Sequence, residues 1–474
     1  MMKWWMLPRV RRGLALSAIV LSAGGLILHR APAAAQSGGG AATLLTTIQG
    51  SSFQGPGAHG TMALTQTRVL AGTPQHIYAE IDFNADQAEG VKERAPVSLA
   101  VVLDTSGSMS GEKIDQAKSA VLKLIANMKD DDQIAFIRYS DTHDVLQPLA
   151  RLGDVRQNLT RRIQELQADG GTMIAPALAE GKRVLEEAKK DRVRRIVLAS
   201  DGLDGTRAQS EAFARSAFDE GITVSSLGIG LDFDEKYMGS VATSGHGNFA
   251  FVKDGTSLTG FLNQELLEAS TTTISNSEVT LHVPDGMRFV SAMGADAVQH
   301  GQDVTLNVGS LFAGDSRRVV AELEVTAAAD QTLTVGADVG WTLVKGERRV
   351  AANDVKLSLR GTTDSRAAQA SQNGAVFANA TSVFASKRQL DAAEAYARGD
   401  NARAQQLIDN NMADLAVAAK AAPAPEAAAM QRQISSYGLT KKEFQSAGPG
   451  SDRGKSAAKS AVSQDLGNMK RGSF

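Results

Sequence analysis

Residues 97–111 read VSLAVVLDTSGSMSG and join a short apolar run to a loop rich in oxygen-bearing side chains. A continuous apolar run of this length predicts a strand that is buried on both faces of a parallel sheet. In the next segment, residues 112–128, Ile114, Val121 and Leu124 recur at helical spacing. A strand, a polar loop and an amphipathic helix in this order predict the start of a βαβ unit.

The same alternation of apolar runs and helical patterns continues to residue 270. The further predicted strands are QIAFIRY (133–139), RRIVLAS (194–200), ITVSSLGIG (222–230) and NFAFV (248–252). Each is followed or preceded by a segment with helical periodicity, so helices are expected on both sides of the sheet. The sequence therefore predicts a doubly wound α/β domain with a mostly parallel sheet over residues 96–272.

On both sides of the α/β segment, apolar and polar residues alternate with a period of two instead. Val279, Leu281 and Val283 alternate with polar residues, and β-like runs separated by turn signals precede residue 96. These patterns predict an antiparallel β-sandwich in two parts, residues 46–95 and 273–362. Because the ends of a domain usually lie close together, we expect the α/β domain to be inserted in the sandwich or flanked by it.

The C-terminal segment is rich in alanine. Residues 364–437 show helical spacing with a break at Gly399-Asp400, which predicts a helical hairpin. Residues 438–474 are rich in Ser, Ala, Gly and Lys, and this composition favours a disordered tail.

The N-terminal segment has the plan of an export signal. Residues 1–12 are basic, residues 13–28 are apolar, and small residues follow at Ala33 and Ala35. We expect a cleaved signal peptide over 1–35, a linker over 36–45, and a protein in the periplasm, at the cell surface or secreted. The alternative is an uncleaved anchor, and only then do we expect membrane contact; the apolar run is shorter than the ~20 residues of a spanning helix.

The composition of the 474-residue chain excludes several classes of protein. There is no cysteine, so disulfides, cysteine zinc sites and cysteine nucleophiles are absent. The 50 basic and 52 acidic residues give a net charge of −2, which lacks the basic excess typical of nucleic-acid binding. We therefore expect no nucleic-acid partner.

Three loops of the predicted α/β domain supply oxygen donors for a metal ion. Asp104, Ser106 and Ser108 follow the first strand, Thr172 follows a glycine pair before a helix, and Asp201 follows the strand RRIVLAS. Loops at the carboxyl ends of parallel strands meet at one edge of the sheet. Carboxylate and hydroxyl oxygens suit Mg²⁺, Mn²⁺ or Ca²⁺ rather than zinc.

The motifs DTSGS, GGT and SDG, in this order, resemble the metal-ion-dependent adhesion site of von Willebrand factor A domains. The resemblance covers residues 96–270. It implies that the five residues hold the ion, some directly and some through water, and that the last metal position is left for an Asp or Glu of a partner protein. In this family the final helix of the domain sometimes slides on metal binding, which the sequence alone does not decide. No acidic residue follows in Met109-Ser110-Gly111, so a second adjacent ion is not supported.

The loop at residues 104–111 does not match known catalytic motifs. The segment lacks the Gly-x-Ser-x-Gly pattern of a nucleophile elbow, and no base is paired with a nucleophile. We therefore expect no enzyme and no small-molecule substrate. The predicted function is an exported, adhesion-type protein that binds a partner's acidic residue through a Mg²⁺ ion; the alternative is an envelope scaffold or assembly factor that binds through its C-terminal helices and holds a structural metal.

Overall fold

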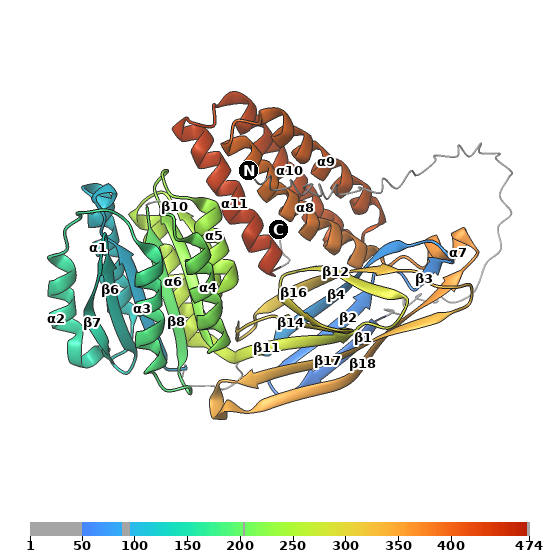
Figure 1. The fold of residues 1–474 in the computed structure, drawn as a ribbon, viewed down its shortest axis with the longest axis horizontal. Coiled ribbons are helices and arrows are strands. Elements are labelled where there is room, and N and C mark those ends of the chain that lie inside the picture. Colours follow the sequence, from blue (N-terminus) through green and yellow to red (C-terminus); the bar gives the residue numbers. More distant parts are fainter. Residues whose placement is uncertain (1–49, 88–94, 202–203, 472–474) are drawn as a thin grey trace, which may run out of the picture. The chain divides into compact units, whose positions relative to one another are not determined.

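The computed structural model describes residues 50–87, 95–201 and 204–471 (Figure 1). The signal peptide predicted over 1–35 and the linker predicted over 36–45 lie outside these residues, as does the start of the predicted segment 46–95. Within the described ranges, none of the helices combines the length and the apolar character needed to cross a bilayer.

A six-stranded sheet forms the centre of the α/β region, in the order β10-β9-β8-β5-β6-β7. The strands are β5 (Val97–Asp104), β6 (Gln133–Tyr139), β7 (His143–Arg151), β8 (Val193–Ser200), β9 (Ile222–Ile229) and β10 (His246–Val252). All neighbours run parallel except β6 and β7. Every residue of β5 is buried, as its continuous apolar run predicted.

Strand β7 was not predicted from the sequence. It lies at the edge of the sheet, most of its residues are only half-buried, and it contains Pro148. Proline has no N–H to donate, so it is tolerated at a sheet edge where one side of the strand has no neighbour. A half-buried strand interrupted by proline lacks the apolar run that marked the other five strands.

Helices cover both faces of this sheet. They are α1 (Glu112–Asn127), α2 (Leu152–Gln164), α3 (Ile174–Glu186), α4 (Arg207–Asp219), α5 (Glu235–Ser244) and α6 (Gly255–Thr271). Side chains of α1, α2 and α6 pack into one apolar core and those of α3, α4 and α5 into another. The two cores are the two faces of a doubly wound sheet, as predicted.

Two mostly antiparallel sheets form a sandwich around a single apolar core. One sheet contains β1 (Gly50–Gly55), β2 (Ala58–Leu64), β4 (Gln75–Ala85), β16 (Ser316–Val325) and β12 (Met287–Met293). The other contains β13 (Asp296–His300), β14 (Asp303–Asn307), β11 (Thr272–His282), β17 (Thr332–Leu343), β18 (Arg349–Thr362), β3 (Arg68–Leu70) and β15 (Leu311–Phe312).

Strands from both sides of the α/β region pair with each other. Ile81 of β4 lies opposite Val319 of β16, and β3 pairs with β18. The two ends of the α/β region are joined by a hydrogen bond of 3.1 Å from Ala95 N to Ser270 O. The α/β region is therefore inserted in the sandwich, one of the two arrangements that the sequence predicted.

The C-terminal region contains five helices, orange to red in Figure 1. They are α7 (Ser365–Ala370), α8 (Gly374–Ala397), α9 (Asn401–Ala421), α10 (Ala424–Ser446) and α11 (Asp452–Arg471). The predicted break at Gly399-Asp400 separates α8 from α9, where Gly399 has a φ of +85° and Asp400 caps α9 by accepting from Arg403 N.

The prediction of a single hairpin followed by a disordered tail over 438–474 is wrong for the described residues. α10 continues to Ser446, and α11 follows it to Arg471. Ala458, Ala461 and Val462 of α11 are buried. The composition suggested disorder because small residues carry little apolar area. Small residues also let helices approach closely, however, and the residues that pack against α11 lie far away in the sequence.

Helix α11 also contacts the α/β region. Lys459 Nζ donates to Phe233 O and to Glu235 Oε2, both at 2.6 Å. Lys470 Nζ donates to His246 O and to Gly247 O, both at 2.9 Å. The last described helix is thereby fixed to the loop after β9 and to the start of β10.

A buried carboxylate in α11 gives the stability of the helical region a pH dependence. Asp465 is 1% exposed and accepts a hydrogen bond of 2.7 Å from the Tyr437 hydroxyl. Burial raises the pKa of Asp465 to about 7 although the bond from Tyr437 opposes the shift. A carboxyl whose folded pKa lies above its unfolded value of 3.8 stabilises the fold most below pH 4, and this contribution is lost as the pH rises towards 7.

We therefore expect Asp465→Asn to become more stabilising as the pH rises, by roughly 2–3 kcal/mol between pH 5 and pH 8. Thermal melts of the variant and of the wild type at the two pH values measure the difference. Asp452→Asn, at the exposed start of α11, is the control. An equal difference between variant and wild type at both pH values would contradict the assignment.

Candidate metal centre

Three loops meet beyond the carboxyl ends of β5 and β8, which are neighbours in the middle of the sheet. The first loop begins at Asp104 and forms a single 3₁₀ turn, η1 (Gly107–Met109). It is tied to the second loop by two backbone hydrogen bonds, Gly107 N to Gly170 O at 2.9 Å and Asp169 N to Thr105 O at 2.8 Å. This arrangement brings the first two predicted donor segments together.

Asp104 is the buried centre of the cluster. Its carboxylate is 0% exposed and accepts from Ser106 N at 2.8 Å and from Ser200 Oγ at 2.7 Å. Burial raises the pKa of Asp104, the hydrogen bonds from Ser106 and Ser200 lower it, and the nearby charge of Asp201 raises it again. A carboxylate in this position favours a neighbouring cation, because a cation offsets both the burial and the repulsion from Asp201.

Asp201 is also 0% exposed and lies at the end of β8. Its Oδ1 accepts from Ser108 Oγ at 2.7 Å, and Ser108 Oγ lies 3.0 Å from Ser106 Oγ. Its Oδ2 accepts from the ammonium group of Lys113. Three of the predicted donors, Ser106, Ser108 and Asp201, thus form one hydrogen-bonded chain, which the backbone of Ser106 joins to Asp104.

Thr172 lies on the second loop and is half-buried. Asp141 shapes this loop by accepting from Gly171 N at 2.9 Å, and Ser140 O accepts from Met173 N at 2.9 Å. Gly170 has a φ of +73°, in the left-handed region that glycine adopts without strain. The structure places Thr172 two residues beyond Gly170, whose carbonyl oxygen accepts from Gly107 N.

Sequence reasoning missed two groups that touch the carboxylates. Ser200 precedes Asp201 directly and donates to Asp104, and Lys113 follows the loop in the first turn of α1. The sequence could have indicated Lys113 by its position, because it lies two residues beyond Gly111, where the chain is still close to the loop. Asp204 was missed as well; it accepts from Ile174 N at 2.6 Å and so fixes the start of α3 beside Thr172.

The donor set fits a hard divalent cation. In the described part of the chain no group of three or more His, Asp or Glu side chains is placed to hold a metal, so the side-chain donors available beyond Asp104 and Asp201 are the hydroxyls of the neighbouring loops. Two carboxylates with serine and threonine hydroxyls are oxygen ligands of the kind that Mg²⁺ and Ca²⁺ accept.

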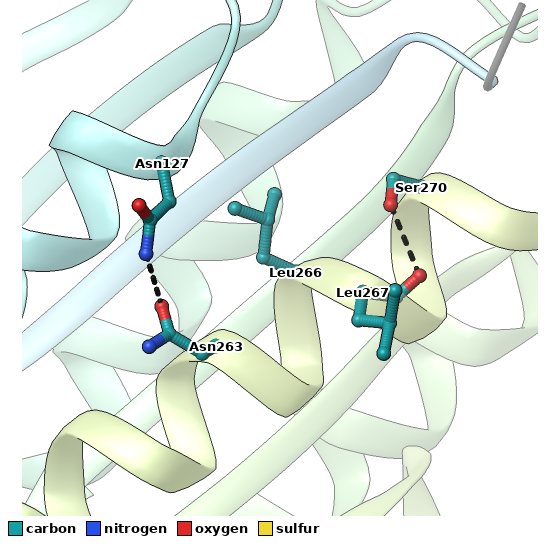
Figure 2. A pocket seen from close by; sticks show the side chains of 5 residues that line it. All are labelled: Asn127, Asn263, Leu266, Leu267 and Ser270. Atoms are coloured by element: carbon teal, nitrogen blue, oxygen red, sulfur yellow. Dashed lines mark hydrogen bonds between the residues drawn. The ribbon is translucent and has the colours of Figure 1, made fainter.

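A separate pocket of about 380 Å³ lies at the other end of α1 (Figure 2). It is lined by Asn127, Asn263, Leu266, Leu267 and Ser270, and Asn127 Nδ2 donates to Asn263 Oδ1 at 2.8 Å. Because α1 begins next to the carboxylates and ends at Asn127, the pocket is about 24 Å away from them, the length of a 16-residue helix. It is not part of the candidate metal centre.

Comparison with known proteins identifies the class of the α/β region. Residues 98–264 match the family model of the von Willebrand factor type A domain. The chain therefore contains a domain of this class, as the three motifs indicated. Such domains generally mediate protein interactions rather than catalysis, and they commonly bind a divalent metal.

Curated relatives match part of the chain. An uncharacterised protein of Synechocystis is 28% identical over 203 residues, 42% of this chain and 48% of that protein. An uncharacterised protein of Escherichia coli is 24% identical over 49% of this chain and 42% of its own length. Inter-alpha-trypsin inhibitor heavy chain H3 of Bos taurus is 28% identical over 32% of this chain and 18% of that protein. The chain thus spans less than half the length of each of these relatives.

Two solved structures match most of the chain in fold. A von Willebrand factor type A protein from Catenulispora acidiphila has a TM-score of 0.68 and 18% identity, and covers 89% of this chain and 99% of its own. The ArnB paralog VWA2 from Sulfolobus acidocaldarius has a TM-score of 0.58 and 12% identity, and covers 88% of this chain and 99% of its own. At these identities the likeness is one of fold.

Proposed function

We propose that this protein is an exported, non-enzymatic binding protein that recruits an acidic residue of another protein through a divalent cation. Asp104, Ser106, Ser108, Thr172 and Asp201 would hold the ion, with Mg²⁺ as the first candidate and Mn²⁺ or Ca²⁺ as alternatives. The bound ion would supply a positive centre with a ligand position for the partner's Asp or Glu.

One observation carries this proposal: two fully buried carboxylates, Asp104 and Asp201, converge with serine hydroxyls at the carboxyl ends of β5 and β8. Burial of two like charges is unfavourable unless cations or hydrogen bonds compensate them. Ser108, whose hydroxyl donates to Asp201, is exposed, and so is Met173 on the loop that carries Thr172, so another molecule can reach this cluster.

Export is proposed on the sequence of residues 1–35 alone. A basic segment, an apolar run and small residues in this order are typical of a signal peptide. The absence of cysteine is compatible with folding in an oxidising compartment.

The proposed site predicts that Asp104→Ala lowers the affinity for Mg²⁺ at least about 100-fold, because even the loss of a group outside the metal shell costs 10–100-fold. Isothermal calorimetry of residues 36–474 measures this directly. Capture of a partner from envelope extract or culture fluid, with the captured protein identified by mass spectrometry, should be lost with Asp104→Ala and with EDTA.

Asp115→Ala is the matched control, since Asp115 lies on α1 with its side chain 75% exposed. It should retain both metal binding and capture. Capture that survives both Asp104→Ala and EDTA would refute the metal bridge.

A second candidate function is an envelope scaffold that binds through the C-terminal helices and uses the metal only for stability. The observation that favours it is Leu439 of α10, which is 64% exposed beside a pocket of about 360 Å³ between α10 and α11. Leu439→Lys should then abolish capture while Asp104→Ala leaves it intact, the reverse of the result expected for the metal bridge. Deletion of residues 364–474 is less informative, because α8 covers buried residues of the sandwich such as Val320.

A further inference from the structure

Lys113 brings a cationic side chain into contact with the candidate metal centre. It lies in the first turn of α1, and its ammonium group pairs with Asp201 Oδ2. The side chain of Lys113 is 29% exposed whereas that of Asp201 is 0% exposed. The ammonium therefore reaches from the surface onto a fully buried carboxylate.

Both oxygens of Asp201 are engaged in this arrangement. Oδ1 accepts from Ser108 Oγ at 2.7 Å and Oδ2 accepts from Lys113. A divalent cation that uses Asp201 must share the carboxylate with the ammonium or displace it. Two cations on one carboxylate repel each other strongly where the surroundings are buried and poorly screened.

Lys113 also lies within electrostatic range of a second carboxylate, Asp232, which pairs with Lys455. Asp232 follows β9, and although burial opposes the effect, a hydrogen bond from Lys455 lowers the pKa of Asp232 and the charge of Lys113 acts in the same direction. Gly230 in the same loop leaves room for the lysine chain, because a Cβ there would lie 3.1 Å from Lys113 Cε.

We propose that Lys113 is a positioning residue of the metal centre that competes with the divalent cation for Asp201. This inference rests on the proposed metal site. Lys113 holds the Asp201 carboxylate in place and raises the concentration of cation needed to fill the site. Removing its charge should therefore tighten metal binding, although it removes an ion pair from the fold.

The test compares Lys113→Met with the wild type in two measurements on residues 36–474. Calorimetric titration with Mg²⁺ should show about tenfold tighter binding for the variant. In EDTA the variant should melt at a lower temperature than the wild type, because Asp201 has lost its partner. Excess Mg²⁺ should raise the melting temperature of the variant more than that of the wild type, since tighter binding stabilises the folded state more.

Two controls separate charge from other effects. Lys113→Arg keeps a cation at the position and should bind Mg²⁺ with an affinity close to that of the wild type. Lys123→Met removes an exposed lysine from the same helix and should change neither measurement.

Each result bears on the inference. Unchanged or weaker Mg²⁺ binding in Lys113→Met, with binding abolished in Asp104→Ala, overturns the role of Lys113 and leaves the metal site standing. A melting temperature lowered equally in EDTA and in Mg²⁺ shows a merely structural ion pair and also overturns it. The failure of every variant and of the wild type to bind Mg²⁺ overturns the metal site and this inference together.

Discussion

Arg195→Met is expected to destabilise the α/β region by about 3–5 kcal/mol, the usual cost of removing one partner from a buried ion pair. Arg195 Nη1 lies 2.8 Å from Glu265 Oε2 and 3.5 Å from Glu268 Oε2, and all three side chains are at most 5% exposed. Burial acts to raise the pKa of Glu268, but Arg195 and Arg471 outweigh it and lower the pKa to about 2. Without Arg195, α6 would carry buried carboxylates with too little compensation.

Urea denaturation followed by circular dichroism measures this loss. Arg161→Met, on the exposed side of α2, should stay within about 0.5 kcal/mol of the wild type. Adding Glu265→Gln to Arg195→Met should recover part of the stability, because it removes the carboxylate that lies nearest to Arg195. A loss below about 1 kcal/mol in the single variant would mean that the ion pair contributes little to the fold.

Trp341→Ala is expected to destabilise the sandwich by a similar amount, about 3–5 kcal/mol, through the cavity that it leaves. Trp341 of β17 is 0% exposed, and its ring packs edge-on against Phe83 with centroids 5.7 Å apart and lies 6.3 Å from Phe53. Its Nε1 donates to Pro56 O at 2.8 Å. The side chain thus joins strands of both sheets.

Denaturation curves recorded by circular dichroism test this result, since the variant lacks the signal of Trp341 itself. Trp341→Phe should cost less, because it keeps an aromatic ring and loses the hydrogen bond to Pro56. Val298→Ala, at a side chain 43% exposed, should change the free energy of unfolding by less than about 0.5 kcal/mol. A Trp341→Ala curve that overlaps with that of Val298→Ala would contradict the assigned role.

The α/β fold and the position of its site followed directly from the sequence. Each of the five predicted strands is an apolar run, and four of the five predicted metal donors, Asp104, Ser106, Ser108 and Asp201, lie at or just after the end of such a strand, so local patterns place these four together. The partners of Asp201 and Asp104 were not predicted in full, because the direction of the Lys113 and Ser200 side chains depends on packing rather than on spacing.

The C-terminal region shows that amino-acid composition alone did not predict helix α11. Ser, Ala and Lys at 452–471 give no strong local signal, and the residues that bury α11 lie in α8, in the loop after β9 and in β16, far away along the chain. Long-range contacts of this kind leave no periodic mark in the sequence. The half-buried edge strand β7 was missed for a related reason, because an edge carries weaker alternation and tolerates Pro148.

The hydrogen bond between Ala95 N and Ser270 O has a consequence for the order in which the chain folds. β4 and β16 can pair only when the segment between them is closed into a loop. If that long segment were flexible, closing it would cost roughly 3 kcal/mol more chain entropy than closing a loop of a few residues. An α/β insert that has already folded brings its ends together and removes this barrier. The Trp341 fluorescence of the folded sandwich should therefore appear only after the insert has formed. It should appear more slowly in a variant whose insert is destabilised.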